Sequence, residues 1–272
     1  MSLLHPLCAI DPSAVLGDGV AVGAFASIGA GVEVGDRTEI AAGARLQGPT
    51  RIGSENRIHS NVCLGGDPQD LKFAGEAVRL EVGDRNVIRE FTTFHRGTGK
   101  GGGLTRVGDE NLFMVYSHVA HDCSVGSRTI FANCATLAGH VEVGDDAIIG
   151  AFTAVQQYGR VGKHAYLGGY TRILADALPF VKTVGLRPAV YGVNRIGLKR
   201  KGFDDDRVRA IQRACRIFLR SGLNTTQALE QLETEFADQA DVRYFVEFVR
   251  GAKRGVVKAL PTRRAEEDSG GE

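Results

Sequence analysis

Residues 28–64 read IGAGVEVGDRTEIAAGARLQGPTRIGSENRIHSNVCL, with Ile, Val or Leu at every sixth position. The same spacing begins at Ile10, returns at residues 82–94 and runs from Val107 to Ile173, so that 25 positions carry an aliphatic residue or Phe. A period of six fits neither the 3.6-residue period of an α-helix nor the alternation of a simple strand. Each hexad is therefore expected to be a short strand and a corner, and the spacing predicts a parallel β-helix.

Three hexads would close one triangular coil of eighteen residues. Residues eighteen positions apart should then stack on neighbouring coils, about 4.8 Å from each other, as adjacent strands do in any sheet. Offsets along the chain thereby predict which side chains form columns in space.

The hexads end after Ile173, and we expect the β-helix to occupy residues 1–187. Apolar residues at helical spacing follow, at 208–219, 229–236 and 242–249. They predict an α-helical domain at 188–260 that covers the open end of the coil, because a bare last coil would expose its core and a sheet edge. The polar segment 261–272 is predicted to be a disordered tail.

The repeat is interrupted twice, at 65–81 and at 96–106. In the first segment Asp70 and Glu76 fall where apolar residues are due, and the second segment is rich in glycine. Both are predicted to leave the coil as loops, and insertions in a solenoid commonly mark its working face. Leu71 and Phe73 indicate that the first loop packs against something.

Composition excludes several classes of protein. A formal net charge of +1 argues against a nucleic-acid partner, which favours a strongly basic face. The five cysteines show no pairing pattern and are expected to be buried thiols. No signal peptide and no apolar run of the ~20 residues needed to span a membrane can be recognised, so we expect a cytoplasmic protein.

Four of the seven histidines lie between residues 95 and 140. His121, Gly139 and Gln157 follow each other at intervals of eighteen residues, which predicts one column at an edge of the coil. The column beside it should hold Asp122, His140 and Tyr158.

This arrangement suits acyl transfer. A neutral imidazole at His121 can accept a hydroxyl proton, and Asp122 can orient that imidazole. Gly139 lacks a Cβ, so a carbonyl group could approach its backbone N–H, a donor of the kind that stabilises an oxyanion. His95 and His118 are expected to line the cleft.

Other interpretations stay open at this point. Histidine-rich β-helices can bind zinc, which would make the chain a hydratase of the carbonic anhydrase type. A second alternative is that the chain is a scaffold without catalytic activity. A cysteine nucleophile is disfavoured, because alternation places Cys123 on the opposite side from His121.

Six segments resemble the UDP-N-acetylglucosamine O-acyltransferases, within the hexapeptide-repeat acyltransferases. They are PQDLKFAGE (68–76), FHRGT (94–98), GGGLTRVG (101–108), SHVAHDCSVG (117–126), NCATLAGHVEV (133–143) and GVNRIGLKRKGF (192–203). The resemblance implies a left-handed β-helix and a homotrimer with active sites between subunits. It also implies transfer of a 3-hydroxyacyl chain from acyl carrier protein to the glucosamine 3-hydroxyl of UDP-N-acetylglucosamine, the first step of lipid A biosynthesis. No cofactor or metal is implied, since the acyl group arrives on the phosphopantetheine of the carrier.

Residue roles follow from the same motifs. The resemblance makes His121 the general base, Asp122 its partner and Gly139 the oxyanion donor. The substrate groove would be lined by Asp70, Lys72, His95, His118, His140 and Gln157. The nucleotide sugar would be bound by Asn194, Arg200 and Lys201. Gly169 would set the length of the acyl chain.

Two positions depart from the family pattern. Many members have His where this chain has Gln156, and an acidic residue where it has Ile196. These departures bear on the nucleoside contacts and leave a 3-amino sugar nucleotide as an alternative acceptor.

Overall fold

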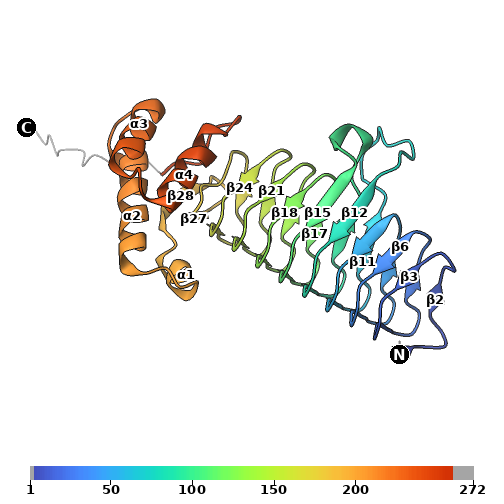
Figure 1. The fold of residues 1–272 in the computed structure, drawn as a ribbon. Coiled ribbons are helices and arrows are strands. Elements are labelled where there is room, and N and C mark those ends of the chain that lie inside the picture. Colours follow the sequence, from blue (N-terminus) through green and yellow to red (C-terminus); the bar gives the residue numbers. More distant parts are fainter. Residues whose placement is uncertain (1–2, 260–272) are drawn as a thin grey trace, which may run out of the picture.

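The computed structural model describes residues 3–259, which form a long three-sided coil followed by a group of helices (Figure 1). Three sheets, here named A, B and C, run along the sides of the coil. Sheet A contains, in spatial order, β1 (Leu3–Leu4), β4 (Ala21–Val22), β7 (Glu39–Ile40), β10 (Arg57–Ile58), β13 (Val87–Ile88), β16 (Leu112–Phe113), β19 (Ile130–Phe131), β22 (Ile148–Ile149), β25 (Tyr166–Leu167), β27 (Val181–Val184) and β28 (Ala189–Val193).

The two other sheets have the same construction. Sheet B contains β2 (Ala9–Ile10), β5 (Ser27–Ile28), β8 (Arg45–Leu46), β11 (Cys63–Gly66), β14 (Thr93–His95), β17 (His118–Val119), β20 (Thr136–Leu137), β23 (Ala154–Val155) and β26 (Arg172–Ile173). Sheet C contains β3 (Val15–Leu16), β6 (Val32–Val34), β9 (Thr50–Ile52), β12 (Arg79–Val82), β15 (Leu104–Val107), β18 (Ser124–Val125), β21 (Glu142–Val143) and β24 (Arg160–Val161).

The predicted offset of eighteen residues is confirmed where the hexads are unbroken. Val119 pairs with Leu137, and Leu137 with Val155, in parallel ladders. The hexad positions are buried from Val22 onward, whereas Ile10 and Leu16 are partly buried because the first coil is covered on one side only. The stacked apolar residues form one continuous core along the axis of the coil.

Both excursions are shorter than the segments 65–81 and 96–106 expected from the sequence. β11 extends to Gly66, β12 already begins at Arg79, and β15 begins at Leu104. The reason is that Arg79 pairs with Leu104, so the ladder of sheet C extends beyond the hexads on both strands. The remaining loops, 67–78 and 96–103, lie side by side (Figure 1), and an ion pair between Asp67 and Arg96 joins them.

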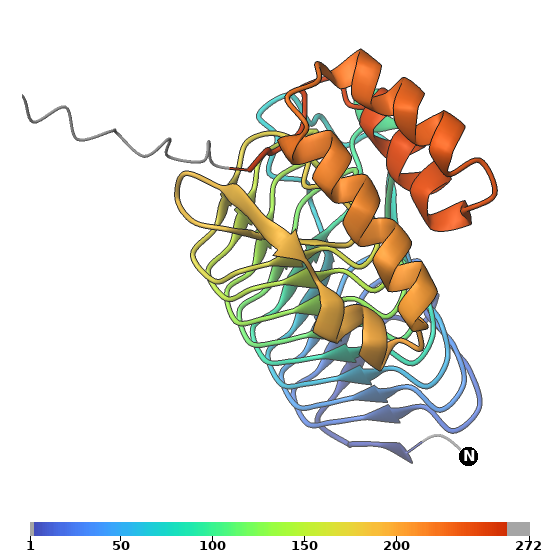
Figure 2. The same ribbon diagram turned by 90° about the vertical axis from the view of Figure 1, so that its left-hand side faces the viewer.

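In the described part of the chain four helices cover the C-terminal end of the coil (Figures 1 and 2): α1 (Arg195–Arg200), α2 (Asp205–Arg220), α3 (Thr225–Glu235) and α4 (Ala240–Arg250). α2 begins where the Asp204 side chain accepts a hydrogen bond from the Arg207 N–H, and such a cap stabilises the start of a helix. Phe218 of α2 packs edge-on against Phe245 of α4, with ring centroids 5.4 Å apart.

The β-structure continues beyond the boundary expected at residue 187. β28 pairs antiparallel with β27, and Asp176 forms a bridge to Val256 after α4. These contacts attach the end of the helical domain to the last coil, and neither follows the hexad period. The tail predicted at 261–272 lies outside the described residues.

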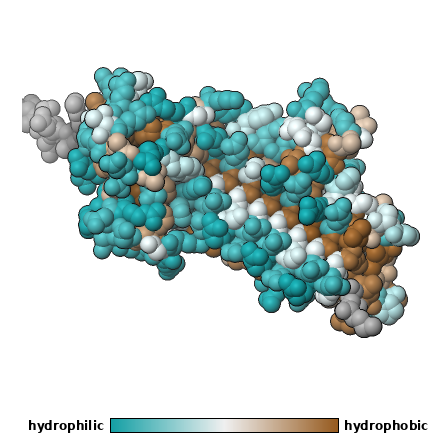
Figure 3. All heavy atoms as spheres, in the orientation of Figure 1, coloured by the Kyte–Doolittle hydropathy of each residue, from teal (hydrophilic) through white to brown (hydrophobic). Residues whose placement is uncertain are grey.

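Apolar surface gathers near the N-terminal coils (Figure 3), where Leu3, Leu7 and Val15 are exposed. Within residues 3–259 no helix combines the length and the apolar character that a membrane span requires.

Candidate active site

The predicted histidine column lies at the edge where the chain passes from sheet B to sheet C, here named the B–C edge. His121 and Asp122 form this corner between β17 and β18, and Gly139 and His140 form it one coil later. The backbone N–H of His140 donates to the carbonyl oxygen of His121 at 3.0 Å, which fixes the stacking of the two corners. The predicted stacking of the two columns is thus confirmed.

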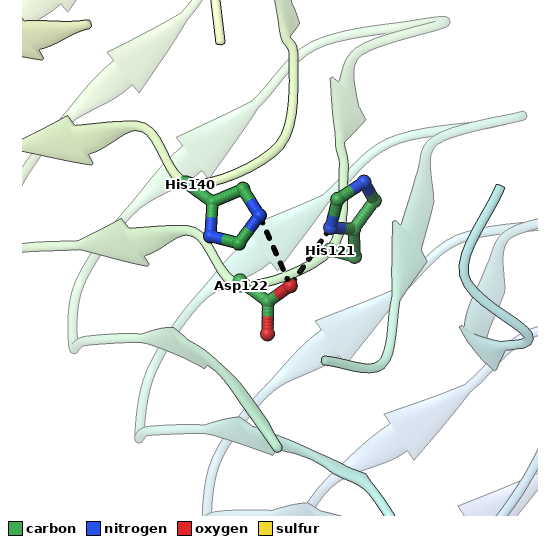
Figure 4. A group of neighbouring side chains, drawn as sticks. All are labelled: His121, Asp122 and His140. Carbon is green, nitrogen blue, oxygen red and sulfur yellow. Dashed lines mark hydrogen bonds and ion pairs between the residues drawn. The ribbon is translucent and has the colours of Figure 1, made fainter. Parts of the chain in front are cut away.

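His121 and Asp122 form a close pair (Figure 4). Nδ1 of His121 lies 2.8 Å from Oδ2 of Asp122, and Nε2 of His140 lies 3.6 Å from the same oxygen. The Asp122 side chain is 1% exposed, compared with 9% for His121 and 19% for His140. The carboxylate is therefore shielded from water, while the two imidazoles keep a small solvent-exposed fraction.

Gly139 lies directly against the ring of His121. A Cβ at position 139 would stand 2.7 Å from Nε2 of His121, so a side chain there would have to displace the ring. The N–H of Gly139 makes no hydrogen bond to another residue of the described chain, whereas its carbonyl oxygen accepts from the N–H of Tyr158 at 3.1 Å. A backbone donor thus remains unused beside the imidazole.

The second excursion contacts Asp122 directly, which the sequence had not indicated. Thr98 donates to this carboxylate twice: its N–H lies 2.8 Å from Oδ1 and its hydroxyl 2.7 Å from Oδ2. Thr105 accepts from the Asp122 N–H at 2.8 Å. The one sequence signal that could have identified Thr98 is its place in the FHRGT segment.

His95 and His118 lie next to each other on β14 and β17, with ring centroids 5.0 Å apart. Burial lowers the pKa of His118 to about 4, and repulsion from His95 and His121 adds to the effect. Burial also lowers the pKa of His95. Nδ1 of His118 shares a hydrogen bond of 2.7 Å with the Thr93 hydroxyl, whereas Nδ1 of His95 is buried without a partner among the described residues. Both rings are neutral at pH 7.

Asp70 lies in the turn of the first excursion, where its Oδ1 accepts from the Lys72 N–H at 2.9 Å. Burial lowers the pKa of His140, while the negative charges of Asp122 and Asp70 oppose that shift. The negative charge of Asp70 is therefore felt by a histidine of the B–C edge. Leu71 is fully exposed, so the partner expected for it is not supplied by the described part of this chain.

Three further predicted residues lie elsewhere. Asn194 caps α1 by accepting from the Gly197 N–H at 3.2 Å, and it donates to the carbonyl oxygen of His164 at 3.2 Å. Lys201 forms an ion pair with Asp146, N–O 2.7 Å. Because Asp146 and His164 are corner residues between sheets C and A, this group marks the C–A edge.

Arg200 is exposed, and Asn194 and Lys199 line a pocket with it. Within one chain the structure does not bring Arg200, Asn194 or Lys201 together with His121, since they occupy different edges of the coil. Gly169 lies at the third edge, between sheets A and B, and is exposed. Gln157 is exposed on the B–C edge.

The alternatives that the sequence left open can be compared with this geometry. Burial raises the pKa of the Cys123 thiol to about 12, so it is a poor nucleophile. His121, Asp122 and His140 are the one group in the described chain whose ligand atoms could reach a common ion. His118 is outside this group, and its Nδ1 shares a hydrogen bond with the Thr93 hydroxyl.

The coil of hexapeptide repeats places the chain among the hexapeptide-repeat proteins, and the histidine–carboxylate pair at its edge is of the kind that supports acyl transfer. The model of the bacterial transferase hexapeptide matches residues 13–48, and the model of UDP-N-acetylglucosamine O-acyltransferase domain 2 matches residues 176–257. The chain belongs to the UDP-N-acetylglucosamine O-acyltransferase family, as the comparisons with its relatives show.

Two curated relatives are named acyl-[acyl-carrier-protein]--UDP-N-acetylglucosamine O-acyltransferase. The protein from Thiobacillus denitrificans is 49% identical over 258 residues, which cover 95% of this chain and 100% of the relative. The protein from Alkalilimnicola ehrlichii is 48% identical with the same coverage. The solved UDP-N-acetylglucosamine acyltransferase of Francisella novicida has a TM-score of 0.93 at 32% identity and covers 96% of this chain and 95% of its own. The predicted family and the left-handed β-helix with a C-terminal helical domain are thereby confirmed.

Proposed function

We propose that this chain transfers a 3-hydroxyacyl group from acyl carrier protein to the glucosamine 3-hydroxyl of UDP-N-acetylglucosamine, the first step of lipid A biosynthesis. The family and the names of its relatives support the reaction and both substrates. The observation that carries the proposal is the His121–Asp122 pair with Gly139 stacked against it.

The pair can act as a general base. His121 Nδ1–H donates to Asp122, which leaves Nε2 to take the proton of the 3-hydroxyl as its oxygen attacks the thioester carbon. The carbonyl oxygen becomes an oxyanion that the Gly139 N–H stabilises. When the C–S bond breaks, the imidazolium returns the proton to the departing pantetheine sulfur. The reaction needs no metal and no further cofactor.

The substrate groove, in this proposal, follows the B–C edge. Asp70, Lys72, His140 and Gln157 line it beside the base. His95 and His118 are neutral, so they contribute hydrogen bonds and shape rather than fixed charge. Gly169 leaves room on its edge and sets the acyl chain length.

We propose a homotrimer with the active sites between subunits. His121 lies on the B–C edge, whereas Asn194, Arg200 and Lys201 lie at the C–A edge, so a complete substrate site requires edges from two copies. The exposed Leu71 provides an apolar contact for a neighbouring subunit. We also propose that the protein acts in the cytoplasm.

Mass spectrometry of the products from UDP-N-acetylglucosamine and a panel of 3-hydroxyacyl carrier proteins tests the reaction and gives the chain length. Alkaline lability of the product separates an ester at a 3-hydroxyl from an amide at a 3-amino group. His121→Ala is expected to lower kcat by roughly 10²-fold or more with the trimer intact. Full activity of this variant would refute the assignment of His121 as the general base.

Dialysis against a chelator provides a second test, directed at the zinc alternative. The acyltransferase mechanism predicts an unchanged rate after dialysis. A loss of activity that zinc alone restores would favour a zinc-dependent enzyme instead.

A further inference from the structure

The Asp122 carboxylate depends on the second excursion for most of its hydrogen bonds. Its side chain is 1% exposed, and it accepts from the N–H of Thr98, the hydroxyl of Thr98 and Nδ1 of His121. A buried carboxylate without such donors is strongly destabilised. Two of these three donors belong to one residue outside the repeat.

The direction of the Thr98 hydroxyl is fixed by its other neighbour. Its oxygen accepts from the Gly101 N–H at 3.1 Å, so its single proton points to Oδ2 of Asp122. An ionised carboxylate has acceptors only. The remaining proton in this group must therefore be on Nδ1 of His121, which keeps Nε2 free to act as the base.

The glycines of this excursion allow it to lie directly on the carboxylate. A Cβ on Gly101 would overlap the carboxyl group of Asp122, and a Cβ on Gly97 would lie 2.9 Å from Oδ1. Larger residues at either position would push Thr98 and Asp122 apart. The glycines at positions 97 and 101 thus have a specific steric cause.

The excursion is also anchored at its start. The Arg96 guanidinium donates to the carbonyl oxygen of Gly48 at 2.6 Å and pairs with Asp67 of the first excursion. The Arg96 N–H donates to the carbonyl oxygen of Gly66 at 3.0 Å. These contacts hold Thr98, two residues further along, at a fixed distance from the B–C edge.

We propose that Thr98 is a positioning residue that holds Asp122, and through it selects the tautomer and orientation of His121. This inference rests on the proposed function, because it assigns Thr98 to the same general-base reaction. It makes the Gly-rich excursion part of the catalytic apparatus rather than a surface loop.

A Thr98→Val variant removes the hydroxyl and keeps the backbone donor. We expect kcat to fall by about tenfold or more, with KM for both substrates within about twofold, because the lost bond is to a charged group that never touches substrate. Thr98→Ser should restore kcat to within about threefold, since it returns the hydroxyl. If the Val variant does not fold, Thr98→Ala replaces it.

A double-mutant cycle separates positioning from loop folding. In an Asp122→Ala background the Thr98→Val change should alter kcat by less than about twofold, because the group it acts on is gone. Thr92→Val is the matched control: its buried hydroxyl donates to the Met114 carbonyl oxygen at 3.3 Å on another edge, and its kcat should equal that of the wild type.

Each outcome addresses one proposal. Wild-type kcat in Thr98→Val, or a full tenfold effect in the Asp122→Ala background, would overturn the role of Thr98. Loss of activity in His121→Ala alongside those results would leave the proposed function standing. Retention of activity in His121→Ala would refute the general base, whereas absence of an acylated product from the carrier-protein panel would refute the proposed function itself.

Discussion

The imidazole of His121 occupies the space in which a side chain on Gly139 would have to lie. In the proposed mechanism His121 is the proton acceptor and Gly139 the backbone donor, and a Cβ at position 139 would stand 2.7 Å from Nε2. The two catalytic functions are therefore coupled through a single steric contact between neighbouring coils.

Gly139→Ala should lower kcat by about 10²-fold or more, because the added methyl group displaces the imidazole and blocks the oxyanion donor. Thermal unfolding should still be cooperative, since the backbone at 139 has no left-handed conformation that alanine would resist. Steady-state kinetics with a saturating acyl donor measure the effect. A variant as active as the wild type would show that the His121 ring can move without loss of activity.

Acidification should destabilise the protein through its buried histidines. The pKa of His118 is about 4 in the folded chain, below the 6.5 of an ordinary histidine, so the unfolded chain binds more protons between these values. The free energy of unfolding should therefore fall as the pH drops from 6.5, and this loss should be complete below about 4. Urea midpoints across this range for the wild type and His118→Gln measure the slope. Parallel curves would contradict the assignment.

Arg200 and Lys201 should behave differently although they are adjacent. Arg200 has no ion-pair partner in the described chain, whereas Lys201 pairs with Asp146, a side chain that is 7% exposed. Arg200→Ala should raise KM for UDP-N-acetylglucosamine and leave Tm unchanged. Lys201→Ala should lower Tm by a few degrees, because a largely buried carboxylate loses a partner. Calorimetry and initial rates on both variants test this contrast.

Mixed trimers should recover activity that neither parent has. If each site takes His121 from one subunit and Arg200 from its neighbour, refolding His121→Ala with Arg200→Glu in equal amounts restores about a quarter of the sites. The rate is measured at low UDP-N-acetylglucosamine, where the Arg200 variant is impaired. A mixture no faster than the mean of its parents would mean that both residues act within one chain.

Much of the coil could be predicted from the sequence because every coil repeats the same environment. The six-residue period predicted which residues face inward, and the eighteen-residue offset predicted that His121 and Gly139 stack on neighbouring coils. Ile10 and Leu16 fit the six-residue period but are only partly buried, because the first coil has a neighbouring coil on one side only. The period alone does not indicate where such a neighbour is missing.

Contacts outside the repeat could not be predicted in this way. Thr98 and Asp122 are 24 residues apart, an offset that belongs to no column, and the path of the loop depends on how closely its glycines pack. The ion pair of Lys201 with Asp146, which joins the helical domain to the coil, was likewise not predicted. Such docking contacts have no period in the sequence.

The parallel pairing of eighteen-residue coils also limits how the enzyme can change. Each coil lengthens the body by about 4.8 Å, so the span from the histidine corner to the helical cap can grow or shrink only in whole increments of that size. A change in length by only part of a coil would break the strand pairing of every coil that follows it. Fine adjustment to a longer or shorter lipid must therefore come from side-chain volume at fixed positions, while deletion of one complete turn should shorten the molecule and keep its register.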